Sequence, residues 1–107
     1  MPAPAITVEQ LKSRRDRGDA FTLVDVREPH EWAISDLPGS LKIPLGTLPQ
    51  RLGELHPEAE IVVYCRTGGR SANAVEFLRQ KGYPKALNLA GGINHWAEVV
   101  DPAMSRY

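Results

Sequence analysis

The sequence predicts an α/β fold of three layers, in which helices cover both faces of a five-stranded, mostly parallel sheet. Apolar runs such as 61–64 are typical of strands that are buried on both faces. Helical and turn signals separate these runs, and strands that alternate with helices favour parallel crossovers. A chain of 107 residues with 42% apolar residues suits one compact core, so we expect a single domain over residues 1–107.

The N-terminal part predicts a capped helix followed by a strand. Thr7 and Gln10 match the capping-box pattern, and Gly18 marks the end of a helix of about ten residues. The run 21–26 then predicts a strand. This strand contains Asp25, a carboxylate in apolar company, and we expect this side chain to have hydrogen-bond partners.

The middle of the chain combines short elements with proline-containing turns. Pro29 suits the first turn of a helix that follows the strand 21–26. After a turn at 37–40, residues 41–43 predict a short strand. Leucines at helical spacing over 45–55 predict an amphipathic helix, although a proline lies near its start.

The C-terminal part predicts two further strands and two helices. Residues 61–64 form the central strand, and an alanine-rich helix is expected over 71–81. Residues 86–89 predict the last strand of the sheet, after which a glycine pair turns the chain into a last helix over 93–99. The tail 101–107 is either docked on the domain or frayed.

The loop that begins at Cys65 is the strongest candidate for chemistry. Cys65 is the single cysteine and follows a buried strand, and a short loop with two glycines then opens a helix. Backbone N–H groups of such a loop gather at the positive end of the helix dipole and can hold an anion. Together with Arg66 and Arg70 they favour thiolate over thiol. Since carboxyl ends of parallel strands share one sheet edge, Arg27 and Glu28 should lie within reach.

Composition argues against several classes of function. Thirteen basic residues balance thirteen acidic ones, so no bulk charge points to nucleic acid or to an anionic membrane. Residues 1–5 lack the features of a secretory signal, and nothing approaches the ~20 apolar residues of a membrane span. A single cysteine cannot form an internal disulfide, which fits a reducing compartment, and we therefore expect a cytoplasmic protein.

Four segments together resemble the rhodanese (sulfurtransferase) homology domain, in the order and with the spacing of that family. They are Val-Asp-Val-Arg-Glu at 24–28, the turn 37–40, Cys-Arg-Thr-Gly-Gly-Arg-Ser at 65–71, and 89–93 with Trp96. The resemblance spans nearly the whole chain and implies a rhodanese-like three-layer sandwich. The tail up to Tyr107 is further similar to rhodanese domains fused to enzymes that activate sulfur carrier proteins.

The resemblance implies a sulfurtransferase that works through a persulfide. Cys65 would be the nucleophile, which takes sulfane sulfur from a donor such as thiosulfate and passes it to cyanide, a thiol or a sulfur-carrier protein. Asp25 and Arg27 match family positions that support the active-site loop. The substrate-binding residues implied by the resemblance are Arg66, Thr67, Gly68, Gly69, Arg70 and Ser71.

Some points stay open within this hypothesis. The sequence leaves open whether Arg66 or Arg70 recognises an anionic donor. Thr67 departs from mammalian-type thiosulfate sulfurtransferases, which carry a lysine at this position, so thiosulfate is a usable donor and not necessarily the physiological one. No organic cofactor is implied. The three histidines lie in separate segments without ligand spacing, and we expect no metal site.

Two other functions remain as alternatives. Cysteine phosphatases and arsenate reductases also cradle an oxyanion between a strand and a helix, but their loop is one residue longer than the four residues that separate Cys65 from Arg70. The shorter loop suits one sulfur atom better than a tetrahedral phosphate. Rhodanese domains can also act as non-catalytic interaction modules, although such copies usually lack the cysteine that this chain retains.

Overall fold

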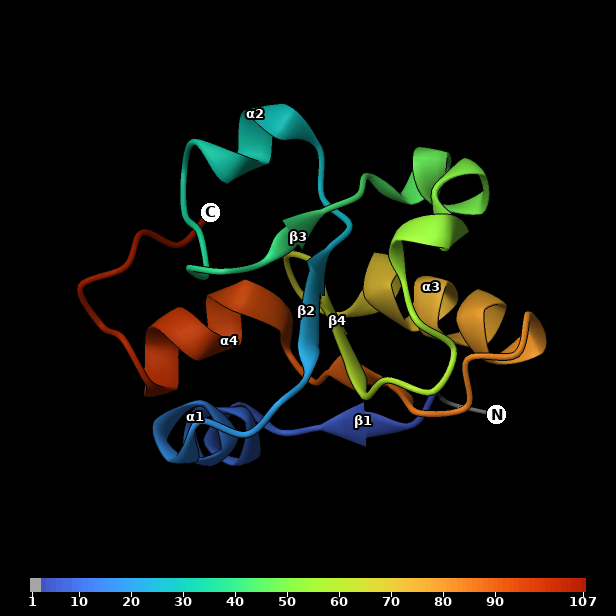
Figure 1. Cartoon of the computed structure of the whole chain (residues 1–107). Helices are drawn as coiled ribbons and strands as arrows, with labels where there is room; N and C mark the ends of the chain where they lie inside the picture. The colour runs from blue at the N-terminus through green and yellow to red at the C-terminus, as the bar shows by residue number, and fades with distance from the viewer. Residues whose placement is uncertain (1–2) are drawn as a thin grey trace.

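A parallel five-stranded sheet forms the middle layer of the protein (Figure 1). The computed structural model describes residues 3–107. Within this range the strand order is β1-β5-β4-β2-β3, and every pair is parallel, which confirms the predicted sheet. The strands are β1 (Ala5–Ile6), β2 (Thr22–Asp25), β3 (Leu41–Lys42), β4 (Ile61–Tyr64) and β5 (Ala86–Leu89). Strand β1 lies where the sequence pattern predicts no strand.

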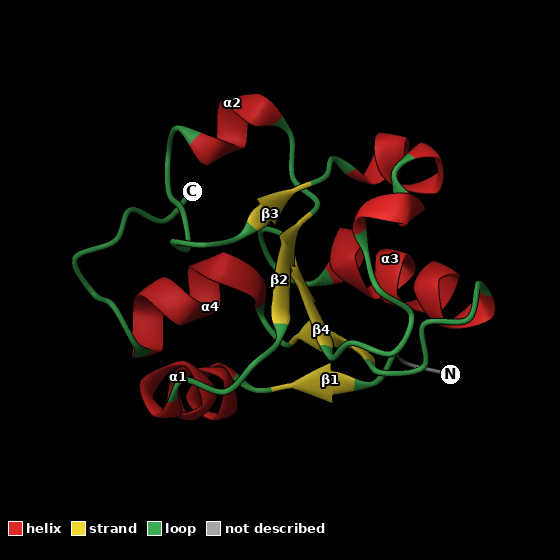
Figure 2. Ribbon diagram, in the orientation of Figure 1, coloured by secondary structure: helices red, strands yellow, loops and turns green. Residues whose placement is uncertain are grey.

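Helices cover both faces of this sheet, as predicted (Figures 1 and 2). Helices α1 and α4 pack on one face, α3 and the two 3₁₀ helices lie on the other, and α2 lies near the last residues of the chain. The bounds are α1 (Val8–Arg17), α2 (Pro29–Trp32), η1 (Leu45–Gln50), η2 (Leu52–Glu54), α3 (Gly69–Gln80) and α4 (Gly92–Val99). The predicted capping box of α1 is confirmed by both of its hydrogen bonds, between Thr7 and Gln10.

The prediction of one amphipathic helix over 45–55 is wrong. This segment forms the two 3₁₀ helices η1 and η2. Pro49 lies inside η1 and has no N–H to donate, so a regular α-helix would lose a hydrogen bond and clash with the preceding turn. The leucine spacing still serves burial, because Leu48 and Leu55 both lie in the core.

No helix within residues 3–107 has the length and apolar character needed to cross a membrane. Across the same range no group of three or more His, Cys, Asp or Glu side chains could hold a metal ion. Of the segment 1–5, in which we expect no secretory signal, Met1 and Pro2 lie outside the described residues.

The alternation of side chains along β4 determines where Cys65 points. Ile61 and Val63 belong to the core cluster on the α3 side, whereas Val62 and Tyr64 belong to the cluster on the side of α1 and α4. Successive side chains of a strand point to opposite faces. Cys65 continues the series of Ile61 and Val63 and packs in the same cluster. Its sulfur is thereby directed to the beginning of α3.

The start of α4 packs directly against the loop that contains Cys65. The N–H groups of Ile93 and Asn94 donate to the carbonyl oxygens of Cys65 and Arg66, at 2.9 and 3.1 Å. Gly92 has a φ of +65°, and a Cβ atom at this position would lie 2.3 Å from the Arg66 carbonyl oxygen. Only glycine fits this contact without a shift of the loop.

Replacement of Gly92 by alanine should therefore destabilise the protein and disturb the Cys65 loop. The left-handed backbone and the clash together predict a loss of about 2–5 kcal/mol in the free energy of unfolding. Urea denaturation measures this loss. Gly53→Ala is the matched control, because Gly53 lacks a positive φ and a Cβ there meets nothing within 4 Å. Equal stabilities of the two variants would contradict the proposed contact.

Candidate active site

Three hydrogen-bond donors converge on the sulfur atom of Cys65. The backbone N–H of Gly68 lies 3.1 Å from Sγ, and the N–H and hydroxyl of Ser71 lie at 3.4 and 3.3 Å. The residue is only 1% exposed. Gly68 has a φ of +111° and precedes the first residue of α3, so the loop turns tightly enough to aim its amides back at the sulfur. The loop donors gather around one point, the Cys65 sulfur, in an arrangement here called the cradle.

This environment favours the thiolate. Burial raises the pKa of the Cys65 thiol, but hydrogen bonds from Ser71, Gly68 and Thr67 lower the pKa more, so that it falls below its ordinary value. The positive end of the α3 dipole acts in the same direction. The thiolate is the nucleophilic form of a cysteine side chain.

Asn88 of β5 supports the cradle, and the sequence analysis did not identify it. Its side-chain amide donates to the Gly68 carbonyl oxygen at 3.1 Å, and its Oδ1 lies 2.5 Å from the Ser71 hydroxyl. The single hydroxyl proton of Ser71 can thus serve either the sulfur or Asn88. Like Asp25, Asn88 is a polar side chain in an apolar strand, and this pattern is the signal for it in the sequence.

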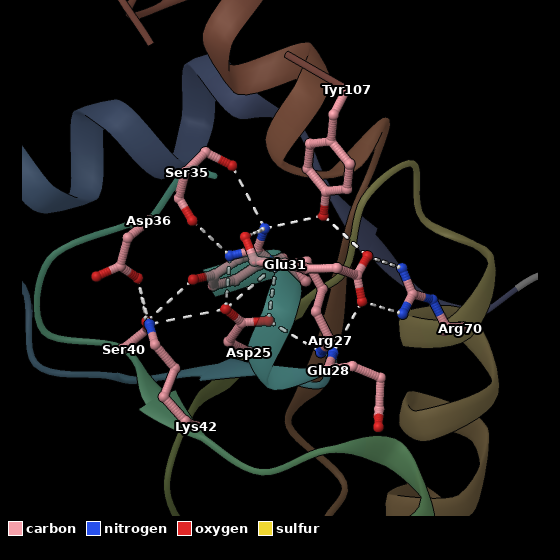
Figure 3. Close-up of polar contacts among 11 residues, drawn as sticks. Asp25, Arg27, Glu28, Glu31, Ser35, Asp36, Ser40, Lys42, Arg70 and Tyr107 are labelled. Carbon is pink, nitrogen blue, oxygen red and sulfur yellow. Dashed lines mark hydrogen bonds and ion pairs between the residues drawn. The ribbon is translucent and has the colours of Figure 1, made fainter. Parts of the chain in front are cut away.

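Arg70 is paired with Glu31 of α2 (Figure 3). Its two terminal nitrogens donate to the two carboxylate oxygens, each at 2.7 Å. This pairing raises the pKa of Arg70 and, with further help from the Glu28 N–H, lowers the pKa of Glu31 to about 2. The bidentate contact joins the beginning of α3 to α2. Glu31 was not predicted as a site residue, since no local pattern links it to a loop 39 positions away.

Asp25 and Arg27 form a fully buried ion pair beneath α2 (Figure 3). The guanidinium of Arg27 contacts both carboxylate oxygens of Asp25 and also donates to backbone or side-chain oxygens of Glu31, Ser35 and Tyr107. The predicted partners of Asp25 are thus confirmed. All donors of Arg27 have acceptors within the protein. Glu28 is exposed, and its backbone N–H and carbonyl groups both bond to Glu31.

Arg66 differs from the other two arginines. Its side chain is exposed, and it forms no ion pair with any carboxylate in the described part of the chain. Its guanidinium carbon lies 5.1 Å from the centre of the Tyr107 ring. Thr67 and Gly69, which complete the exposed rim of the loop, carry no charge. Of the two loop arginines, Arg66 is the one whose charge is not offset by a neighbouring carboxylate.

The protein family follows from the match of residues 7–99 to the rhodanese-like domain. The chain belongs to this family. A sulfurtransferase from Allochromatium vinosum is 40% identical over 92 residues, which cover 86% of each protein. The solved structure of a human single-domain sulfurtransferase, TSTD1, has a TM-score of 0.80 and 31% identity, and the match covers 91% of this chain and 97% of that one.

The similarity also extends to a rhodanese domain within a larger protein. "Probable adenylyltransferase/sulfurtransferase MoeZ" from Mycobacterium tuberculosis is 36% identical over 104 residues, which cover 95% of this chain and 26% of MoeZ. This match agrees with the resemblance of the tail to rhodanese domains of multidomain enzymes. The sulfurtransferase relatives support the assignment of this chain to the transferases.

Replacement of Glu31 by glutamine should lower stability in a pH-dependent manner. The pKa of Glu31 is about 2 in the folded protein and about 4.5 in the unfolded chain, so the carboxylate stabilises the fold above pH 4.5. At pH 7 we expect the free energy of unfolding to fall by about 1–2 kcal/mol. The decrease is modest because solvent partly screens the charge of Arg70. The difference from the parent protein should shrink as the pH falls from 4.5 towards 2.

Urea denaturation at several pH values measures this effect. Glu58→Gln serves as a control, since Glu58 is exposed and makes no ion pair with another described residue. A stability difference between Glu31→Gln and the parent that stays constant down to pH 2 would show that the carboxylate is not held by Arg70.

Proposed function

We propose that this rhodanese domain is a sulfurtransferase that carries sulfane sulfur as a persulfide on Cys65. The observation that supports this proposal most directly is the convergence of three donors on one buried sulfur atom. Such a cage stabilises a single negatively charged atom. It is formed before any substrate arrives, so little reorganisation is required during the reaction.

In the first step the Cys65 thiolate attacks the outer sulfur of the donor. With thiosulfate, a new S–S bond forms to Cys65, the bond between the outer sulfur and the sulfite sulfur breaks, and sulfite leaves with the electron pair. The product is Cys65–S–S⁻. The loop amides that now donate to Sγ are the nearest donors for the terminal sulfur of this anion.

In the second step a nucleophile attacks the terminal sulfur. Cyanide, for example, forms thiocyanate, and the electron pair of the broken S–S bond returns to Cys65 as the thiolate. No net oxidation occurs over the cycle. The hydrogen bonds that lower the pKa of Cys65 also make its thiolate a better leaving group in this step.

The arginines divide the remaining tasks in this proposal. Arg66 recognises an anionic donor, because its charge is exposed and has no carboxylate partner among the described residues. Arg70 holds the loop through its ion pair with Glu31. Arg27, paired with Asp25, donates to the Glu31 carbonyl oxygen and so stabilises the position of α2. Thr67, Gly68, Gly69 and Ser71 contribute the loop backbone around the transferred sulfur.

The acceptor proposed here is a thiol or a sulfur-carrier protein in addition to cyanide. Two considerations support it: the tail resembles rhodanese domains fused to carrier-activating enzymes, and the chain is similar to the adenylyltransferase/sulfurtransferase MoeZ over nearly its whole length. A reducing compartment such as the cytoplasm would keep Cys65 available between turnovers, so cytoplasmic action is part of the proposal.

Intact-protein mass spectrometry tests the persulfide cycle. Incubation with thiosulfate should add the mass of one sulfur atom at Cys65, and cyanide should remove it. Cys65→Ser should retain the fold and gain no sulfur. If neither thiosulfate nor an organic persulfide donor loads Cys65, the proposal fails, and turnover of an aryl phosphate would then favour the phosphatase alternative.

Replacement of Arg66 by glutamine should raise KM for thiosulfate and leave the acceptor step unchanged. Loss of one exposed charge contact predicts an increase in KM of about 5-fold. Steady-state kinetics with thiosulfate, followed by cyanide discharge of preloaded protein, separates the two steps. Arg79→Gln is the control, because Arg79 of α3 donates to the Ala86 carbonyl oxygen of β5 and lies outside the Cys65 loop. An unchanged KM would remove Arg66 from donor recognition.

A further inference from the structure

Tyr107 contacts α4 and the two arginine–carboxylate pairs near the candidate active site, and Figure 3 shows its contacts with those pairs. Its backbone is held by α4, because the Tyr107 N–H donates to Asn94 Oδ1 at 3.2 Å and the Asn94 amide donates to the Tyr107 carbonyl oxygen at 3.3 Å. The ring is half-buried and packs with Val100 and Met104 against the core. The tail is thus docked on the domain.

The Tyr107 hydroxyl bridges two ion pairs. It accepts a hydrogen bond from the Arg27 guanidinium at 2.9 Å and donates to Glu31 Oε1, also at 2.9 Å. The same Glu31 oxygen accepts from Arg70 at 2.7 Å. A continuous path of hydrogen bonds therefore leads from the tail through Glu31 to Arg70, which lies one residue before Ser71 in the cradle of Cys65.

Glu31 is oriented by all of these donors together. Its Oε2 accepts from Arg70 and from the Glu28 N–H, and its Oε1 accepts from Arg70 and from Tyr107. Without the hydroxyl, Oε1 keeps only the Arg70 donor, while Oε2 keeps Arg70 and the Glu28 N–H, so the carboxylate is less firmly oriented. The planar bidentate contact that joins the loop to α2 would then be held less firmly.

The ring of Tyr107 has a second role that does not depend on its hydroxyl. The centre of the ring lies 5.1 Å from the guanidinium carbon of Arg66, the loop arginine without a carboxylate partner in the described structure. An aromatic face attracts a cation without neutralising its charge. The ring can therefore restrict the position of Arg66 while leaving its charge available to an anion.

We propose that Tyr107 is a positioning residue for sulfur transfer, whose hydroxyl orients Glu31 and Arg70 and whose ring positions Arg66. This inference rests on the proposed function for its kinetic part only. It assigns to the tail two separable effects. The hydroxyl acts on the reactivity of Cys65 through Arg70, and the ring acts on donor binding through Arg66.

Two variants separate these effects. Tyr107→Phe removes the hydroxyl and keeps the ring, whereas Tyr107→Leu removes both and keeps an apolar side chain against the core. Tyr83→Phe is the matched control, because the Tyr83 hydroxyl also makes a hydrogen bond within the protein, to the Leu52 carbonyl oxygen at 3.0 Å, away from the Cys65 loop. The control measures the effect of losing one tyrosine hydroxyl on stability alone.

The first measurement is the pH dependence of Cys65 alkylation by iodoacetamide, which requires no turnover. In both Tyr107 variants the midpoint should move to higher pH by about 0.5 unit, because Arg70 then holds the start of α3 less firmly and the neighbouring Ser71 groups donate less well to Sγ. Tyr83→Phe should show the midpoint of the parent protein. A midpoint that is unchanged in both Tyr107 variants would overturn the role of the hydroxyl.

The second measurement is steady-state kinetics with thiosulfate and cyanide. Tyr107→Phe should lower kcat by about 5-fold with KM unchanged, and Tyr107→Leu should in addition raise KM by about 2–5-fold. Equal KM values for the two variants would overturn the role of the ring. If the parent protein transfers no sulfur, the proposed function fails, while the alkylation midpoints still decide the role of the hydroxyl.

Discussion

Burial of a sulfur atom whose surroundings favour the negatively charged thiolate is the constraint on which the site depends. A charge removed from water is tolerated only where hydrogen bonds replace its hydration. Here the replacement comes from the Gly68 and Ser71 groups at the start of α3, and their positions depend on three neighbours. Strand β4 directs Cys65 to this side of the sheet, Asn88 of β5 holds the Gly68 carbonyl, and Gly92 lets α4 pack on the loop. Strands β4 and β5 and the first residues of α3 and α4 therefore together determine the surroundings of the Cys65 sulfur.

Of the arginines near this atom, Arg27 and Arg70 are paired with carboxylates. Arg66 has no carboxylate partner among the described residues. Arg27 is neutralised by Asp25, and Arg70 by Glu31. A fully buried pair such as Asp25–Arg27 contributes little net stability compared with apolar residues, but removal of one partner is strongly destabilising. The value of the two pairs here is geometric: they fix α2 against both β2 and α3. Arg66 differs in being held by an aromatic ring, which preserves its charge.

The sequence carries local information well and distant contacts poorly. The strand 61–64 and the glycine loop after Cys65 were predictable, because an apolar run and a loop with two glycines are visible within ten residues. Strand β1 was missed since two residues between Pro4 and Thr7 form no pattern and become a strand only by pairing with β5. The same limit applies to Glu31 and Tyr107, whose partners lie far away along the chain. Over 45–55 the leucine spacing was informative about burial, but Pro49 decided the type of helix.

The position of the tail has a practical consequence for work with this protein. Tyr107 lies beside α2 and within the hydrogen-bond network of the active-site loop, whereas β1 forms the far edge of the sheet from β3. An affinity tag or a fluorescent reporter joined after Tyr107 would emerge next to the loop and could pull the ring away from Arg66. Attachment ahead of β1 keeps such additions away from the chemistry, and assays of material tagged at the other end would report on the tag as well as on the enzyme.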